Sequence, residues 1–169
     1  MKVLRLLILC FAITFCCQAK TGKVIVGAEQ TNVYLPILKN KRIAVLSNHT
    51  GMIGNEHLVD MLHREKYNVT AIFSPEHGFR GTADAGEHVK SSVDEKTGIP
   101  IRSLYEGGLN RPGNEAMGSF DILIVDIQDV GLRFYTYYVT MVKMMDACAE
   151  FNKKVLILDR PNPNGHYVD

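Results

Sequence analysis

Short apolar runs alternate with longer amphipathic segments along this chain. Between residues 55 and 66 the apolar positions recur at helical spacing, so a helix is predicted there with Asn55 as its N-cap. The same spacing predicts a second, longer helix over 134–151. The apolar runs predict strands over 42–47, 69–73, 121–127 and 155–158.

The long helix is predicted to turn one apolar stripe toward the core. The stripe consists of Tyr138, Met141, Val142, Met145 and Cys148. Before this helix, residues 82–118 contain eight glycines or prolines, which predicts a long excursion with one or two short strands, including 101–105.

Continuous apolar strands separated by helices predict an α/β fold with a parallel sheet covered by helices on both faces. Right-handed crossovers then bring the carboxyl ends of the strands to one edge of the sheet, where ligands bind in such folds. Polar residues follow the strands at 48–50, 74–80, 128–133 and 159–164. These four clusters, far apart in sequence, are expected to meet at that edge.

The first nineteen residues have the pattern of a signal peptide. Lys2 and Arg5 precede an apolar stretch at 6–16, which is too short for a membrane span. Cleavage is predicted after Ala19, and residues 20–169 then form the folded domain of an exported protein, periplasmic or extracellular. A lipid-anchored form using Cys16 or Cys17 is the weaker alternative, because bulky Phe15 does not suit a lipoprotein signal.

The charge of the exported part excludes some functions. Without residues 1–19 it has 17 basic and 18 acidic residues, a net charge of −1, which argues against nucleic-acid binding. Cys148 is the one cysteine left, so no internal disulfide is expected. No later segment is apolar enough to span a membrane.

The most chemically loaded segment follows the predicted strand 69–73. It reads Ser-Pro-Glu-His-Gly-Phe-Arg-Gly over residues 74–81. Glu76 is a candidate general acid, a role that requires burial to favour its protonated form, and His77 is a candidate partner of Glu76 or of the substrate. The structural alternative makes Glu76 a helix cap or an ion-pair partner of Arg80.

The other clusters supply further candidates for substrate binding. Asp126 and Gln128 project to one side of the predicted strand 121–127, where burial requires that they be paired. Arg133 is suited to bind a carboxylate with two hydrogen bonds, or to form a structural ion pair. The remaining candidates are Asn48, His49, Asp129, Tyr135, Asp159, Arg160 and Asn162.

Three other kinds of site lack their usual patterns. No two histidines have the helical spacing of a zinc site, and no Cys-x-x-Cys occurs. The turn at 47–54 has neither the dinucleotide fingerprint nor a phosphate loop, and no Gly-x-Ser-x-Gly marks a serine hydrolase. No cofactor is therefore expected.

Five motifs in order resemble those of the exo-β-N-acetylmuramidase family. They are Ser-Asn-His-Thr-Gly at 47–51, the segment 74–81, Ala-Gly-Glu at 85–87, residues 126–137, and Asp-Arg-Pro-Asn-Pro at 159–163. The resemblance covers about residues 24–168.

The resemblance implies an exported glycoside hydrolase that releases N-acetylmuramic acid from the non-reducing end of peptidoglycan fragments, such as a disaccharide with N-acetylglucosamine or a muropeptide. It implies a Rossmann-like domain that needs no nucleotide, with a second α/β domain expected beyond this chain and the active site between them. Glu76 matches the proposed acid. Arg80 or Arg133 is a sensible partner for the lactyl carboxylate, and Glu87, Asp126 and Asp129 are candidates for a second carboxylate.

Two other functions remain open from the sequence. A non-catalytic module would bind muropeptides without turnover. A metal-dependent esterase or deacetylase would use His49, His77 and Asp126 as ligands. Turnover by the wild type that is lost in Glu76→Gln would favour the glycosidase over the binding module. Loss of activity on addition of a chelator would favour the metal-dependent enzyme.

Overall fold

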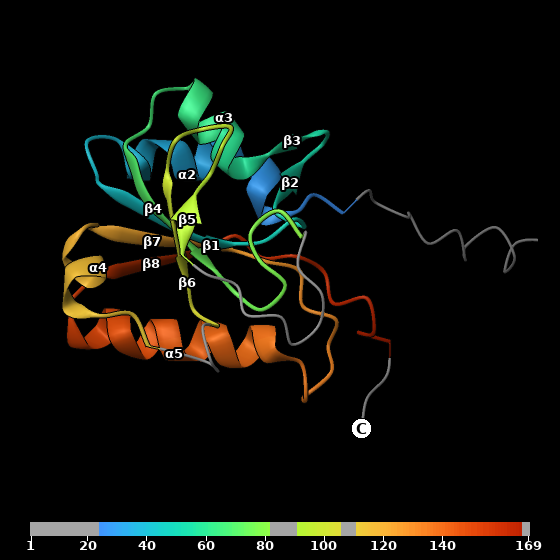
Figure 1. Ribbon diagram of the computed structural model, residues 1–169. Coiled ribbons are helices and arrows are strands. Elements are labelled where there is room, and N and C mark those ends of the chain that lie inside the picture. Colours follow the sequence, from blue (N-terminus) through green and yellow to red (C-terminus); the bar gives the residue numbers. More distant parts are fainter. Residues whose placement is uncertain (1–23, 82–90, 106–110, 167–169) are drawn as a thin grey trace, which may run out of the picture.

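The structure, a computed structural model, describes residues 24–81, 91–105 and 111–166 (Figure 1). The predicted signal segment 1–19 lies outside these residues. Across the three described ranges, no helix is long and apolar enough to cross a membrane.

The chain forms a six-stranded sheet, a small hairpin and helices. The strands are β1 (Ile43–Ser47), β2 (Met52–Ile53), β3 (Glu56–His57), β4 (Val69–Ser74), β5 (Ser92–Val93), β6 (Pro100–Ser103), β7 (Ile122–Asp126) and β8 (Lys154–Ile157). The helices are η1 (Gly27–Glu29), α2 (Thr31–Leu38), α3 (Leu58–Arg64), α4 (Asn114–Gly118) and α5 (Thr136–Glu150).

The predicted α/β architecture is confirmed. The sheet has the strand order β5-β6-β4-β1-β7-β8, and every pairing is parallel except that of β5 with β6. Helices α2 and α3 cover one face, and α4 and α5 cover the other (Figure 1). Strands β1 and β7 are buried along their whole length, as continuous apolar runs indicate.

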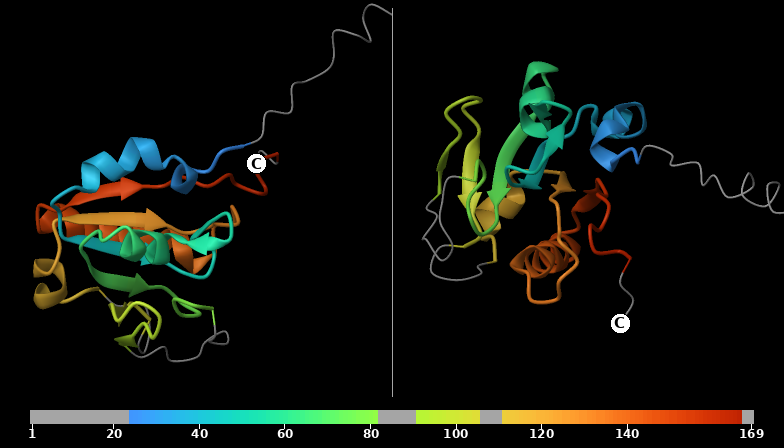
Figure 2. Two further views of the ribbon diagram at one scale, coloured as in Figure 1. Left: turned by 90° about the horizontal axis from the view of Figure 1, so that it is seen from above. Right: turned by 90° about the vertical axis from the view of Figure 1, so that its right-hand side faces the viewer.

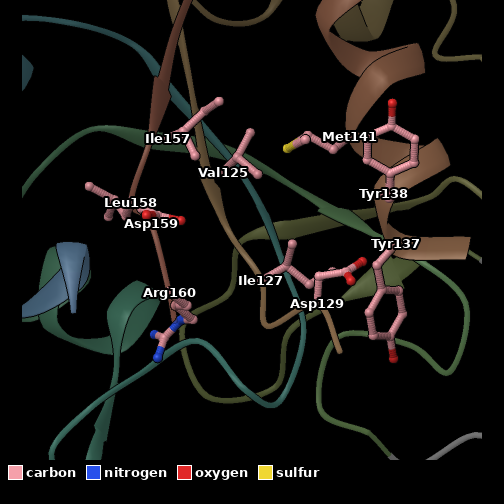
Figure 3. Close-up of a pocket in the computed structure, with 10 residues that line it drawn as sticks. All are labelled: Val125, Ile127, Asp129, Tyr137, Tyr138, Met141, Ile157, Leu158, Asp159 and Arg160. Atoms are coloured by element: carbon pink, nitrogen blue, oxygen red, sulfur yellow. The ribbon is translucent and has the colours of Figure 1, made fainter. Parts of the chain in front are cut away.

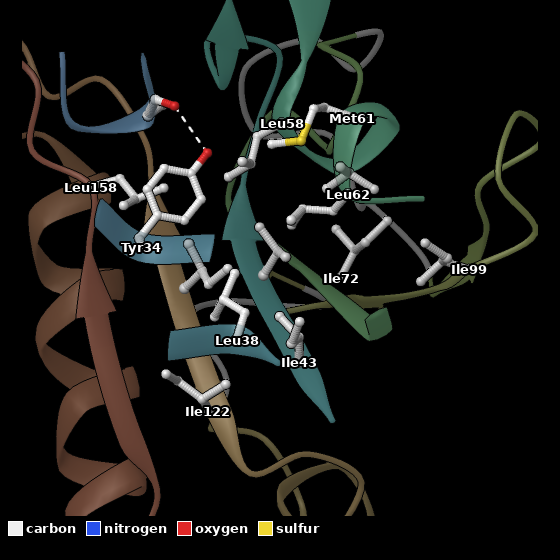
Figure 4. Packing of buried hydrophobic residues seen from close by; sticks show 14 of the residues in the cluster. Tyr34, Leu38, Ile43, Leu58, Met61, Leu62, Ile72, Ile99, Ile122 and Leu158 are labelled. Atoms are coloured by element: carbon white, nitrogen blue, oxygen red, sulfur yellow. Dashed lines mark hydrogen bonds between the residues drawn. The ribbon is translucent and has the colours of Figure 1, made fainter. Parts of the chain in front are cut away.

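Each face of the sheet has its own apolar core. On the α2–α3 face, Tyr34 and Leu38 pack with Leu62 against the sheet, and the Tyr34 hydroxyl donates to the carbonyl of Ala28 at 2.9 Å (Figure 4). On the α4–α5 face the core contains Phe73, Phe120, Met117, Met144 and Cys148. Full burial of one such large apolar side chain stabilises the fold by roughly 1.5–3 kcal/mol.

Two local predictions are wrong. Residues 52–57 form the β2–β3 hairpin, so α3 begins at Leu58 and its N-cap is His57 rather than Asn55. The His57 ring accepts a hydrogen bond from the amide of Val59 at 3.1 Å, while its Nε2 lies 2.8 Å from the carbonyl of Asn48. A contact with a distant loop therefore selects the cap.

The buried stripe of α5 is also rotated from its prediction. The helix buries Tyr137, Thr140, Met144, Ala147 and Cys148. Tyr138 is 56% exposed and Met145 39% exposed, although both belong to the predicted stripe. The sheet thus receives smaller and more polar side chains than the apolar pattern indicates.

Candidate active site

The carboxyl ends of the parallel strands point to one edge of the sheet, as predicted (Figure 2). At this edge the segment after β1 meets the segments after β4 and β7. The ring of His49 packs against Gly81, where an added Cβ would lie 2.7 Å from Nδ1 of the histidine. The amide of Gln128 donates to Oγ1 of Thr50 at 3.0 Å. Neighbouring loops are therefore tied together directly.

The segment that carries Glu76 is a tight turn. The amide of Gly78 donates to the carbonyl of Pro75 at 3.2 Å. His77, Gly78 and Gly81 all have positive φ angles, of 70°, 79° and 73°. The left-handed conformation costs a non-glycine residue about 1–2 kcal/mol, so His77 holds some strain beside the candidate acid.

Glu76 reaches across the edge to α5. The hydroxyl of Thr136, the first residue of α5, donates to Oε2 of Glu76 at 2.9 Å. Tyr137 follows in the helix and is buried. This burial raises the pKa of its hydroxyl, the Asn48 side chain opposes the change, and Tyr135 and Glu76 add smaller contributions to the rise. Glu76 itself is half-buried. Its carboxylate thus lies beside the start of α5.

Asn48 and Thr50 organise the loop after β1. The backbone amide and the hydroxyl of Thr50 both donate to Oδ1 of Asn48, at 3.0 and 2.6 Å. Asn48 is fully buried, and its side chain also interacts with the hydroxyl of Tyr137 in α5. Gln128 connects this loop onward, because its Nε2 donates to the carbonyl of Pro161 at 2.9 Å.

Asp126 and Arg160 form a buried ion pair across β7 and β8. Nε and Nη2 of Arg160 donate to the two oxygens of Asp126 at 2.6 and 3.1 Å, and Nη2 also donates to the carbonyl of Met52 at 3.0 Å. The Asp126 side chain is 0% exposed. Burial raises the pKa of Asp126, and the attraction of Arg160 only partly offsets it. This pair connects the end of β7 to the segment after β8 and, through Met52, to the β2–β3 hairpin.

Arg80 is held by two buried carboxylates. Its Nη2 lies 2.9 Å from Asp60 in α3 and 2.8 Å from Asp94 after β5. Burial opposes ionisation of both acids, but the hydrogen bonds from Arg80, with help from Lys96 and Thr97, outweigh it and lower the pKa of each. The network anchors the Glu76 turn to α3 and to the strand pair β5–β6.

A pocket of about 310 Å³ opens between the ends of β7 and β8 and the first turns of α5. Figure 3 shows the tyrosines of α5 on one side and Asp159 and Arg160 on the other. Oδ2 of Asp129 is shielded from solvent there without a hydrogen-bond partner among the described residues. The lining residues are Val125, Ile127, Asp129, Tyr137, Tyr138, Met141, Ile157, Leu158, Asp159 and Arg160.

The remaining candidates lie around this pocket and turn. Tyr135 precedes α5 and packs its ring edge-on against Tyr137, with centroids 5.4 Å apart. Arg133 is exposed in the turn just before it. Asn162 contacts Gly131, where an added Cβ would lie 2.2 Å from its Oδ1. Candidate Glu87 lies outside the described residues.

Three residues that the sequence did not single out also shape the site: Thr136, His57 and Gly51. Burial lowers the pKa of His57, which caps α3 and contacts the loop after β1. An added Cβ on Gly51 would lie 2.2 Å from Oγ of Ser47. Their positions depend on tertiary contacts rather than on spacing. Within the described ranges, no three side chains converge in the manner of a metal site.

Comparison with known proteins gives consistent matches. Residues 43–169 match the family model described as "Exo-beta-N-acetylmuramidase NamZ, N-terminal". The chain is 47% identical over 150 residues to peptidoglycan beta-N-acetylmuramidase NamZ of Bacillus subtilis (strain 168), covering 87% of this chain and 36% of that protein.

Two crystal structures of DUF1343 family proteins from Bacteroides fragilis NCTC 9343 have the same fold. The first is 64% identical with a TM-score of 0.76, covering 88% of this chain and 38% of its own. The second is 38% identical with a TM-score of 0.73, and the match covers 82% of this chain and 35% of that chain. The chain thus spans little more than a third of the length of these relatives.

Proposed function

The chain belongs to the family of N-terminal domains of exo-beta-N-acetylmuramidase NamZ, and from this membership we propose that the protein is a glycoside hydrolase acting on peptidoglycan fragments. It would release N-acetylmuramic acid from the non-reducing end. The substrate is therefore a saccharide of a muramic acid and its neighbouring sugar, with or without a peptide stem.

We propose Glu76 as the general acid. The observation that carries this assignment is its position: it follows the central strand β4 at the carboxyl edge, half-buried, and reaches the start of α5 beside the pocket. Glycoside hydrolysis requires a carboxylic acid that protonates the leaving oxygen. From this position Glu76 would give its proton to the glycosidic oxygen as the bond to the sugar breaks.

The lactyl carboxylate of muramic acid requires a cation. Arg80 is engaged by Asp60 and Asp94, so binding of the substrate carboxylate there would compete with two buried acids. Arg133 is exposed in the turn before α5, close in sequence to Thr136. We propose Arg133 as the arginine that binds the lactyl group, because it is exposed in this turn and a guanidinium can bind a carboxylate through two parallel hydrogen bonds.

The test is turnover of a nitrophenyl β-N-acetylmuraminide by the full-length protein. Glu76→Gln is expected to lower kcat/KM by about 10²–10⁴-fold, because an amide cannot donate the proton. Glu115→Gln is the matched control, since Glu115 lies 90% exposed in α4 and contacts Arg102. Its activity should equal that of the wild type.

Each other outcome has a definite meaning. Full activity in Glu76→Gln would remove Glu76 as the acid while leaving the glycosidase. Absence of turnover in the wild type, together with binding of the saccharide measured by calorimetry, would instead establish a muropeptide-binding module.

A further inference from the structure

Thr136 makes the side-chain contact that fixes Glu76. The two residues lie sixty positions apart, and the hydrogen bond from Oγ1 to Oε2 measures 2.9 Å. Neither end is loose: Glu76 belongs to the turn closed by Pro75 and Gly78, and Thr136 begins a fifteen-residue helix. The contact therefore connects two well-fixed backbones through one side-chain hydrogen bond.

The backbone around Thr136 is itself anchored. The hydroxyl of Thr140, which is fully buried, donates to the carbonyl of Thr136 at 2.8 Å. The amide of Tyr135 donates to the carbonyl of Leu132 at 3.0 Å and closes the preceding turn. Because these contacts define where the Thr136 hydroxyl lies, they also define where the Glu76 carboxylate lies.

We propose that Thr136 is a positioning residue for Glu76, holding Oε2 so that Oε1 is directed at the glycosidic oxygen. The inference rests on the proposed function of Glu76 as general acid. Thr136 does not touch the reacting atoms; it sets the orientation of the group that does. A proton donor misplaced by about 1 Å can lose up to 10²-fold in rate, which sets the scale of the effect.

The kinetic constants distinguish positioning from substrate binding. Thr136 orients the proton donor and is not assigned a contact with the sugar, so loss of its hydroxyl should lower kcat while KM changes little.

The experiment measures kcat and KM for the full-length protein as wild type, Thr136→Val and Thr136→Ser. Valine keeps the branched shape and removes the donor, whereas serine keeps the donor. We expect Thr136→Val to lower kcat by about 10-fold with little change in KM. Thr136→Ser should keep both constants near those of the wild type.

The matched control is Thr70→Val. The Thr70 hydroxyl donates to the carbonyl of Ile43 at 3.2 Å, at the opposite end of the sheet, and is also half-buried. Its removal deletes a comparable hydrogen bond and should leave kcat and KM unchanged. Thermal unfolding of all variants shows whether each is folded at the assay temperature.

The outcomes separate this inference from the function it depends on. An inactive wild type would contradict the proposed function. An active wild type whose kcat is unchanged in Thr136→Val would overturn the positioning role and leave the glycosidase intact. A loss of activity that follows loss of thermal stability, or that Thr136→Ser shares, would make the contact merely structural and would also overturn the inference.

Discussion

Replacing Arg160 by methionine tests the buried ion pair at the candidate active site. The change removes two hydrogen bonds to Asp126 and one to the carbonyl of Met52, but keeps an unbranched apolar stem. Asp126 is 0% exposed and the Arg160 side chain 9% exposed, so solvent cannot replace the lost partner without opening the edge.

The expected cost follows from this burial. Removal of one partner of a buried pair leaves an uncompensated charge and costs about 3–5 kcal/mol of unfolding free energy. In the wild type, burial already raises the pKa of Asp126 in spite of Arg160, which indicates that the pair offsets a desolvation cost rather than adding net stability. The double variant Asp126→Asn with Arg160→Met should therefore recover about 2 kcal/mol of the loss.

The pH dependence has a definite sign. Without Arg160, the pKa of Asp126 in the folded chain rises further above its unfolded value, so the protonated form is favoured in the folded state. The loss of unfolding free energy in Arg160→Met is then smallest below about pH 4 and grows as the pH rises toward neutrality. Urea unfolding of residues 24–169 between pH 4 and 8 measures it.

Two results would refute this reasoning. A deficit below about 1 kcal/mol at pH 7 would mean that water reaches Asp126. A deficit that does not change with pH would mean that the loss comes from packing of the arginine stem and not from the carboxylate.

Two further variants probe the loop after β1. Burial lowers the pKa of His57, so protonation of this ring favours the unfolded chain. The stability present above about pH 6.5 should therefore be lost as the pH falls below that value. His57→Asn keeps an acceptor for the amide of Val59 and should flatten this pH dependence in urea unfolding. Gly51→Ala places a Cβ 2.2 Å from Oγ of Ser47 and should cost about 1–3 kcal/mol. Gly118→Ala, whose Cβ meets nothing within 4 Å, should stay within about 0.5 kcal/mol of the wild type in the same assay.

The strands were predictable because strands buried on both faces consist mainly of consecutive apolar residues. All five residues of β1 and all five of β7 are buried, and the first four of each are apolar, so each strand reads as an apolar run that ends at a polar residue. The parallel topology then follows from the intervening helices. The meeting of four polar clusters at one edge required no more than this alternation.

The missed elements depend on contacts that a local pattern does not contain. α2 has Pro36 inside it and gives a weak helix signal, yet it is fixed by burial of Tyr34 and Leu38. Asn55 is a good cap in isolation, but His57 takes that role because its ring also contacts the carbonyl of Asn48. Tertiary packing overrides propensity in both places.

The helix face of α5 shows a different limit. A stripe chosen by hydrophobicity favours Tyr138 and Met145 over Thr140, yet Thr140 is fully buried and Tyr138 is more than half exposed. Thr140 tolerates burial because its hydroxyl donates to the carbonyl of Thr136 within the helix. A polar residue whose hydroxyl forms a hydrogen bond within its own helix can thus replace an apolar residue in the core.

The spacing of the carboxylates in the sequence does not indicate which of them donates a proton. Their burial and partners in the structure favour one of them. A carboxylic acid that donates a proton must reach the substrate and must not be held as an anion by an arginine. Asp126 has no exposure, and Asp60 and Asp94 are kept ionised by Arg80. Glu76 is half-buried, and its described side-chain partner, the hydroxyl of Thr136, carries no positive charge, so Glu76 meets both conditions where these three do not.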